Sequence, residues 1–98
     1  MLWNEQIELG NQVETIEYGE PVQTIVYTTV YANKKSVRQT EFYEAKQLGL
    51  KPEIMFEIYF QEYDGEEFVR YNNKVYTILR VYEKDTIIEL VVGALNNG

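Results

Sequence analysis

Residues 68–95 constrain the fold more than any other stretch, because strand and turn signals agree there residue by residue. Asn72-Asn73 interrupts the stretch, and asparagine tolerates the left-handed backbone that a two-residue hairpin turn requires. The run 75–82 alternates between two faces and is rich in β-branched and aromatic side chains, which is typical of a strand. Three charged residues at 83–85 favour a second tight turn before a return strand at 86–92. These signals predict a three-stranded antiparallel meander.

The alternation divides the run 75–82 into two faces. One face carries Val75, Thr77, Leu79 and Val81, and the other carries Tyr76, Ile78, Arg80 and Tyr82. The return strand is apolar on both faces apart from Glu89. We therefore expect this strand either at the centre of a barrel or covered by a neighbouring chain.

The chain before the meander offers further period-two runs. Residues 3–9 predict a short strand that ends at a Gly10-Asn11 turn. Residues 13–18 and 22–31 predict a hairpin connected at 19–21, and residues 53–60 predict the most one-sided strand of the chain. The expected core faces carry Val22, Thr24, Val26, Thr28 and Val30 in the second of these strands, and Ile54, Phe56, Ile58 and Phe60 in the last.

The period changes between Ala32 and Pro52, where residues 40–48 predict a short helix. Thr40 is the expected N-cap, Gly49 has the place of a left-handed residue after the helix, and Pro52 prevents its continuation. The apolar residues fall on one stripe: Phe42, Ala45 and Leu48. About nine residues are too few for a helix that is stable alone in water, so this one must dock on the sheet or on another subunit.

These elements predict an all-β fold in a single domain of 98 residues. The expected architecture is a small antiparallel β-barrel or sandwich of about six strands, with one short helix inserted between early strands. The long connection between the strands that end near Tyr31 and begin near Ile54 is where function is expected.

The absence of cysteine and histidine removes thiol nucleophiles, disulfides, imidazole bases and the usual zinc ligands. Asp64, Glu66 and Glu67 lack the spacing of a calcium loop or of a glycosidase pair, which favours a solvated turn. We therefore expect no catalytic residues, no metal site, no cofactor and no enzymatic activity. The first nine residues do not read as a signal peptide and no apolar run is long enough to span a membrane, so we expect a soluble, intracellular protein.

The net charge of −7 is unevenly distributed. Residues 1–33 contain five acids and no base, whereas residues 34–52 contain five bases and two acids. The five bases are a candidate gate or partner contact: Lys34, Lys35, Arg38, Lys46 and Lys51. Their expected counterpart is the protein's own acidic sheet, a neighbour's acidic sheet, or nearby DNA. The overall negative charge disfavours DNA as a freely bound ligand.

The chain contains nine tyrosines, and two functional interpretations of them stay open. Single-stranded nucleic acid stacks on aromatic residues of small barrels, but no basic residues are expected on the same faces to attract phosphate. The alternative is the half-buried outer face of the sheet or a subunit interface, where tyrosine is enriched. Its candidate residues are Tyr27, Tyr31, Phe42, Tyr43, Tyr59, Tyr76 and Tyr82.

Two sequence motifs carry a resemblance to a known family. The first comprises Ala32, Asn33, Lys35, Ser36, Val37, Glu41, Phe42, Tyr43, Ala45, Gly49, Lys51, Pro52 and Glu53. The second comprises Tyr63, Asp64, Gly65, Tyr71, Asn72, Lys74, Tyr76, Ile78, Arg80, Tyr82 and Glu83. The pattern, over residues 13–90, resembles the head-closure or head-tail joining (stopper) proteins of long-tailed bacteriophages and prophages. Asn73 stands where that family usually has glycine.

The resemblance implies a small β-barrel that forms a dodecameric ring below the portal and the head-tail adaptor. Such a ring closes the exit channel of the packaged DNA and is the attachment platform for tail proteins. It implies a virion protein, made in the host cytoplasm, with no membrane partner and with its gate in residues 32–52. The alternatives are another neck or tail-completion component, such as an adaptor or tail terminator, and a stand-alone nucleic-acid-binding β-barrel.

Overall fold

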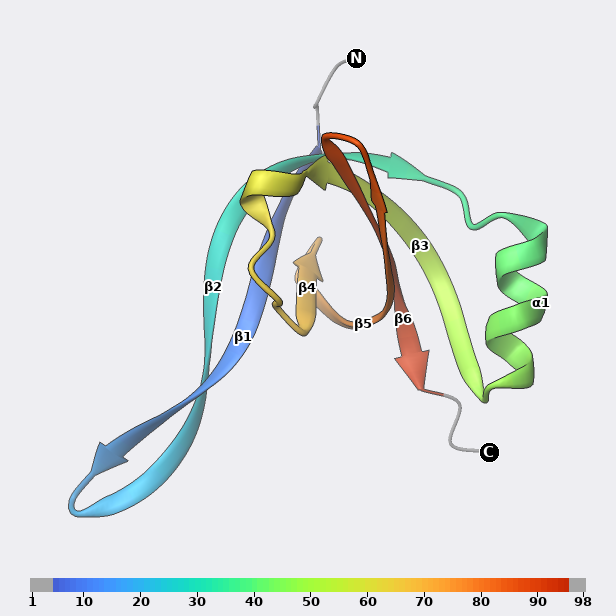
Figure 1. Ribbon diagram of the computed structural model, residues 1–98. Helices are drawn as coiled ribbons and strands as arrows, with labels where there is room; N and C mark the ends of the chain where they lie inside the picture. The colour runs from blue at the N-terminus through green and yellow to red at the C-terminus, as the bar shows by residue number, and fades with distance from the viewer. Residues whose placement is uncertain (1–4, 96–98) are drawn as a thin grey trace.

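The computed structural model of the protein describes residues 5–95 (Figure 1). In chain order the elements are β1 (Glu5–Glu17), β2 (Glu20–Lys35), α1 (Gln39–Gln47), β3 (Leu50–Tyr59), a 3-10 turn η1 (Phe60–Glu62), β4 (Phe68–Tyr71), β5 (Lys74–Lys84) and β6 (Ile87–Leu95). The expected fold class is confirmed, because six antiparallel strands dominate these residues and one short helix is inserted between β2 and β3.

The strands form one sheet whose pairing closes into a ring, in the order β1-β2-β3-β6-β5-β4. Every neighbouring pair in the ring is antiparallel. Two of the strand pairings are short, since β2 pairs with β3 only over residues 33–35 and β1 pairs with β4 only over residues 8–10. A single sheet wrapped on itself therefore encloses the core, rather than two stacked sheets.

The core lies inside this ring. Its buried members are Ile7, Leu9, Val30, Ala32, Phe56, Ile58, Val69, Ile88, Leu90 and Val92. The ring of Tyr71 meets that of Phe56 edge-on at a centroid distance of 5.2 Å. The expected core positions of Phe56 and Ile58 are confirmed, whereas Phe60 has left the strand for η1 and is exposed.

The turn predicted at Gly10-Asn11 is wrong, because Gly10 lies in the middle of the continuous strand β1. Residues 3 and 4 of the predicted first strand lie outside the described residues, and the rest of that strand runs on into the second. Gly10 pairs with Tyr27 of β2, whose ring covers it: a Cβ at Gly10 would lie 2.6 Å from Cε1 of that ring. Glycine here marks a close approach of a neighbouring side chain rather than a turn.

Beyond Gly10 the β1-β2 hairpin leaves the body, and we call residues 11–26 the arm (blue in Figure 1). Within the described chain, no third strand pairs with the arm. Val26, expected in the core, is 53% exposed, because no second layer of structure covers this part of β2. The arm turns at Tyr18-Gly19, where both backbones are left-handed, with φ of 52° and 80°. Such a two-residue turn matches the twist of its strands.

The closing meander has the three predicted strands, but β5 runs on to Lys84, so the second turn is Asp85-Thr86 rather than 83–85, and β6 is Ile87–Leu95. Asn72 and Asn73 both have positive φ, 51° and 63°, as the hairpin turn requires. In β5 the register against β6 shifts between Ile78 and Arg80, so Leu79 is an extra residue. The shift exchanges the faces: Tyr76 and Ile78 pack against the core, whereas Arg80 reaches the side on which α1 lies. The single alternating strand predicted from the sequence was wrong at this point, because a bulge re-aims the side chains that follow it.

The helix α1 lies against β3 on the outside of the ring (Figure 1). Its N-cap is Arg38 rather than Thr40, with no side-chain capping bond, and Gly49 follows it with φ of 77° as predicted. Of the predicted apolar stripe only Ala45 is buried, and the other buried helical residue is Glu41. Polar partners on the sheet select this face, as described below. The strand β6 has the predicted central position, between β3 and β5, and its apolar residues 88 and 90–92 are buried.

At Gly93 the backbone of β3 lies directly against β6. A Cβ on this residue would collide with the backbone of β3, at the carbonyl oxygen of Lys51 and at 2.9 Å from Cα of Pro52. Pro52 is buried inside β3, next to a register shift between Pro52 and Ile54. The strand therefore begins earlier than predicted, since a bulge accommodates proline within it.

Candidate functional site

Two of the five bases in residues 34–52 bind carboxylates of the chain's own sheet. The Lys35 Nζ atom lies 2.9 Å from Oε2 of Glu57, and Arg38 donates two hydrogen bonds to Glu89, of 2.9 and 3.1 Å. Both carboxylates are buried on the outer face of the sheet, below α1. Of the counterparts left open by the sequence, the structure gives Lys35 and Arg38 the protein's own acidic sheet.

The ion pairs form a polar layer on the sheet, which comprises Lys35, Arg38, Glu57, Lys84 and Glu89. Glu89 is the centre of this polar layer. Its side chain has no exposed surface and accepts a third hydrogen bond, 3.1 Å long, from Nζ of Lys84. The hydrogen bonds from Arg38 lower the pKa of Glu89, with a further contribution from Lys84 and against the effect of burial. The same bonds raise the pKa of Arg38. The buried carboxylate is therefore charged, and it fixes the segment through which β2 leads into α1.

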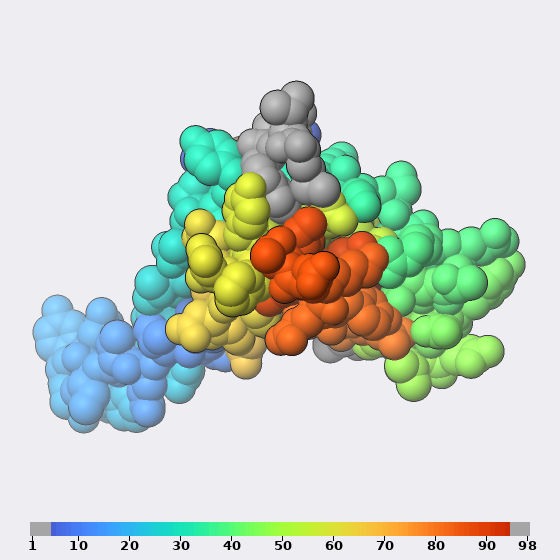
Figure 2. Space-filling model, turned by 45° about the horizontal axis from the view of Figure 1, so that its top comes forward, coloured from blue at the N-terminus to red at the C-terminus, as the bar shows by residue number. Residues whose placement is uncertain are grey.

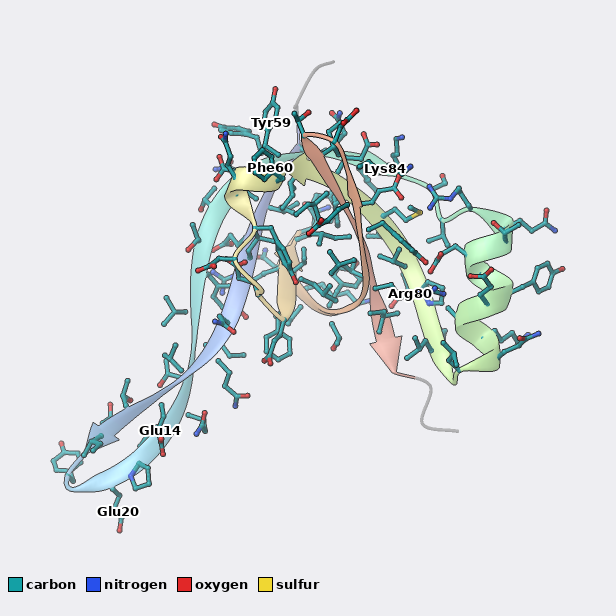
Figure 3. The ribbon with its side chains drawn as sticks, viewed as in Figure 1. Glu14, Glu20, Tyr59, Phe60, Arg80 and Lys84 are labelled. Carbon is teal, nitrogen blue, oxygen red and sulfur yellow. The ribbon has the colours of Figure 1, made fainter. Side chains whose placement is uncertain are left out.

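A second group of contacts anchors the helix itself. The Tyr82 hydroxyl donates a 2.6 Å hydrogen bond to Oε2 of Glu41, and the Arg80 guanidinium lies 3.2 Å from Oε1 of Glu41 and 3.3 Å from Oε2 of Glu44. Arg80 lies on the side of the sheet that faces α1 (Figure 3). Burial raises the pKa of Tyr82, and the bond to Glu41 raises it further. The bulge at Leu79 is what brings both β5 side chains to the helix.

Tyr82→Phe tests this anchor. We expect the free energy of unfolding at pH 7 to fall by about 1 to 2 kcal/mol, because one oxygen of the buried Glu41 loses its donor. Burial raises the pKa of Tyr82, so a phenol that ionises above the ordinary tyrosine range should be present in the absorbance titration of the wild type and missing from that of the variant. Tyr31→Phe, at an exposed position, is the control and should leave both the free energy of unfolding and the ionisation of Tyr82 unchanged.

The other three bases of residues 34–52 have no carboxylate partner among the described residues. Lys34 lies over the ring of Tyr71, at 5.4 Å from its centroid. Lys46 and Lys51 form neither an ion pair nor a ring contact within residues 5–95, and with Phe42 and Leu50 they line a surface pocket. Of the five bases in residues 34–52, these two lysines are available to a partner.

The tyrosines do not form one surface. Tyr31 and Tyr59 line a pocket near η1, and Tyr43 is exposed on α1 beside Phe42. Four of the five partly buried tyrosines of the described chain stand beneath cations, and Tyr63 is the exception. Cations lie over four rings: Arg70 over Tyr27 at 4.0 Å, Lys74 over Tyr76 at 5.0 Å, Arg80 over Tyr82 at 5.3 Å, and Lys34 over Tyr71. The expectation that bases are missing from these faces is therefore wrong. Three of these cations are paired with glutamates, which reduces their attraction for phosphate.

The arm presents a different surface, acidic and apolar. Ile16 is 75% exposed and Tyr18 is fully exposed at its tip. Glu14, Glu17 and Glu20 also lie on the arm, and among the described residues none of them has a basic partner. Figure 3 shows Glu14 and Glu20 on the part of the hairpin that extends away from the body. The arm is therefore the largest element of the described chain that lacks a packing partner.

The sequence interpretation missed the arm and the buried carboxylates. Glu57 and Glu89 each interrupt an apolar run, and such a position in a two-sided strand signals a buried charge that needs a partner. For the arm the signal was weaker. Its residues alternate as those of any half-buried strand do, and only the absence of bases from residues 1–33 distinguishes it.

No family model matches the chain, and no curated protein matches it either. In residues 5–95 there is no cluster of three or more acidic side chains arranged to hold a metal ion. The single helix described here is too short to cross a bilayer.

Proposed function

We propose that the protein is a structural subunit of the head-tail connector of a long-tailed bacteriophage. It would form a ring with other copies below the portal and adaptor, close the DNA exit channel and serve as the platform for tail attachment. The observation that carries this proposal is the arm, whose exposed apolar side chains have no cover in a single chain. Exposed apolar surface of this kind is typical of interaction sites.

Two further features support the proposal. The motifs of the resemblance fall on connected structural parts, since residues 32–53 form the end of β2, α1 and the start of β3, and residues 63–83 lead through the β4-β5 hairpin. The polar layer also fixes α1 to the ring of strands, which gives a connector subunit a rigid body. A ring that resists the pressure of packaged DNA requires such rigidity.

The fold changes how a gate in residues 32–52 has to be tested. Charge reversal at Lys35 or Arg38 would place like charges beside the buried Glu57 or Glu89 and would damage the fold itself. Lys34→Glu leaves these ion pairs intact and removes only the contact with the Tyr71 ring, so it separates DNA contact from the buried ion pairs. A gate that touches DNA would release packaged DNA in virions with Lys34→Glu, whereas retention of the DNA would remove Lys34 from the gate.

Electron cryomicroscopy of virions of the phage that encodes the chain tests the proposal. We expect a ring of copies of the fold between the portal-adaptor assembly and the tail. A nonsense mutation in the gene should yield DNA-filled heads that lose their DNA and do not join tails. Placement against the portal or inside the tail would favour the adaptor or the tail terminator instead. Absence of the chain from the neck would overturn the proposal.

One observation favours a second function, a nucleic-acid-binding barrel: cations lie over four tyrosine rings, and base stacking uses such rings. Titration of the purified protein with single- and double-stranded oligonucleotides at several salt concentrations separates the two functions. Affinity that falls steeply as salt rises would favour the barrel. We expect no measurable binding at physiological salt, because the net charge is −7.

A further inference from the structure

We propose that the arm of one copy docks on the exposed face of α1 of the next copy. We call this second surface the helix face, formed by Phe42, Tyr43 and Lys46 of α1 together with Leu48 and Lys51, which follow the helix. The inference rests on the proposed function in one respect: the contact would join successive subunits of the ring. Its physical basis is independent of the phage, because it consists of two unpartnered surfaces of complementary character on one chain.

The arm needs a partner for its own stability. A two-stranded hairpin without a third strand or a covering layer is marginally stable in water. The arm extends seven residue pairs beyond the body, from Asn11-Val26 to Glu17-Glu20. Its exposed Ile16 and Val26 have no apolar neighbour in the described chain that would hide them from water. A second protein surface would provide that cover.

Two features of the arm tip cost stability in the isolated chain. Tyr18 adopts the left-handed region with φ of 52°, which is unusual for a bulky residue and which asparagine or glycine occupies more readily. Glu17 and Glu20 are directly opposite each other in the hairpin, and like charges at such positions repel. A partner that holds the Tyr18 ring and places cations beside the two glutamates would compensate for both.

The helix face has the required chemistry. Leu48 is 69% exposed, and Phe42 and Tyr43 also present large apolar surface to solvent. Lys46 and Lys51 stand beside this apolar surface without any partner among residues 5–95, and both line the pocket that Phe42 borders.

The acids near this face are already occupied by the chain's own bases. Glu41 and Glu44 bind Arg80, and Glu53 binds Lys74. The face is therefore apolar with a local positive charge, whereas the arm is apolar with a negative charge. Complementary charge of this kind steers association and fixes the orientation of the partners.

The arm and the helix face lie at opposite ends of the molecule (Figure 2). The longest principal extent is 48 Å, so one chain cannot bring its own two surfaces together. The contact therefore joins different copies. Because the two surfaces differ, it is a head-to-tail contact, which produces a ring if the rotation closes and a filament if it does not.

Single-cysteine variants test the contact directly, because the chain has no native cysteine. Ile16→Cys and Leu48→Cys are mixed, one of them with an added mass tag, at about 1 mM of each variant, where a contact with a Kd of about 1 mM is roughly two fifths formed. A short bismaleimide then joins neighbouring thiols. We expect the mixed 16–48 product to form at least about tenfold faster than either homodimer. Thr86→Cys, exposed in the β5-β6 turn, replaces Leu48→Cys in the control and should yield only background product.

Charge reversal checks that the product reflects this surface. Lys46→Glu with Lys51→Glu should reduce the rate of 16–48 cross-linking by about tenfold, and Glu17→Lys with Glu20→Lys on the other partner should restore it. Tyr18→Asn should reduce cross-linking while the free energy of unfolding stays constant or rises, since asparagine suits the turn. If Tyr18 served only the turn, its replacement by asparagine would leave the rate of cross-linking unchanged.

Three results would overturn the inference: predominant 16–16 or 48–48 products, a 16–48 yield no higher than that of the control, or insensitivity to charge reversal. Failure of the inference and failure of the proposed function remain distinguishable. A ring of the chain in the virion neck without a 16–48 product would reject the contact and keep the function. A 16–48 product from a chain that is absent from the neck would support the contact and reject the proposed function.

Discussion

Gly93→Ala is expected to lower the free energy of unfolding by about 3 kcal/mol or more. The added methyl group has no free space, because it would collide with the carbonyl oxygen of Lys51 and with Cα of Pro52, and both belong to the backbone of β3. Backbone in a paired strand cannot move aside without breaking the β3-β6 ladder, whose register runs from Leu50 to Tyr59. In a domain of this size, roughly 4 to 8 °C are lost per kcal/mol, so the melting temperature should fall by roughly 12 to 24 °C.

Gly10→Ala is the matched control. This glycine also lies in a strand, and its added methyl group also meets a close neighbour, but that neighbour is the ring of Tyr27 rather than backbone. A displacement of the Tyr27 ring disturbs only a side chain and its contact with Arg70, so we expect a loss of about 1 kcal/mol, at the lower end of the range for overpacking. Chemical denaturation of both variants decides the matter. Equal losses would show that β3 gives way at Gly93 as readily as the Tyr27 ring does at Gly10.

Glu89→Ala is expected to cost about 3 kcal/mol at pH 7. The substitution leaves the Arg38 guanidinium and the Lys84 ammonium without their shared partner below the helix. Both cations are about half exposed and recover part of their hydration, which keeps the loss at the lower end of the range for buried ion pairs. Because Arg38 is the N-cap of α1, the loss should include local opening of the helix. Amide hydrogen exchange in residues 38–48 should therefore accelerate more than exchange in β6.

The pH dependence of stability follows from the lowered pKa of Glu89. A carboxyl group with a lower pKa in the folded state stabilises the protein above the pKa of an ordinary glutamate, about 4.3, and loses that contribution as pH falls through the folded value. The difference in unfolding free energy between wild type and Glu89→Ala should thus be constant near neutrality and shrink below pH of about 4. A difference that grows in acid would contradict the ion-pair explanation.

Glu8→Ala is the control for this variant. Glu8 also receives two hydrogen bonds from one arginine, Arg70, at 3.0 and 2.6 Å, and these bonds also lower its pKa. Both partners of this pair are partly exposed, however, whereas Glu89 is not. We expect a clearly smaller loss for Glu8→Ala, because water replaces the lost partner at an exposed site. The comparison isolates burial as the cause of the larger effect.

The candidate site was predictable from the sequence only in part. The bases at 34–52 were identified, and their possible binding to the protein's own sheet was among the expected counterparts. Which of them bind it was not predictable, because the partners of Arg38 and Arg80 are 51 and 36 residues distant along the chain. The predicted apolar stripe of α1 was wrong for the same reason: buried carboxylates and their partners, rather than hydrophobicity, select the face that packs on the sheet.

The sequence by itself determined the local elements of this protein. The Asn72-Asn73 turn, the alternating strands of the meander and the glycine after α1 follow from backbone preferences and from side-chain periods that act between near neighbours. The tertiary structure alone decided which faces are covered. One extra residue, Leu79, turns Arg80 toward the helix, and the end of the body at Gly10 leaves the following residues exposed. Burial depends on where distant strands meet and end, and a period-two pattern is the same in a covered strand and in a projecting one.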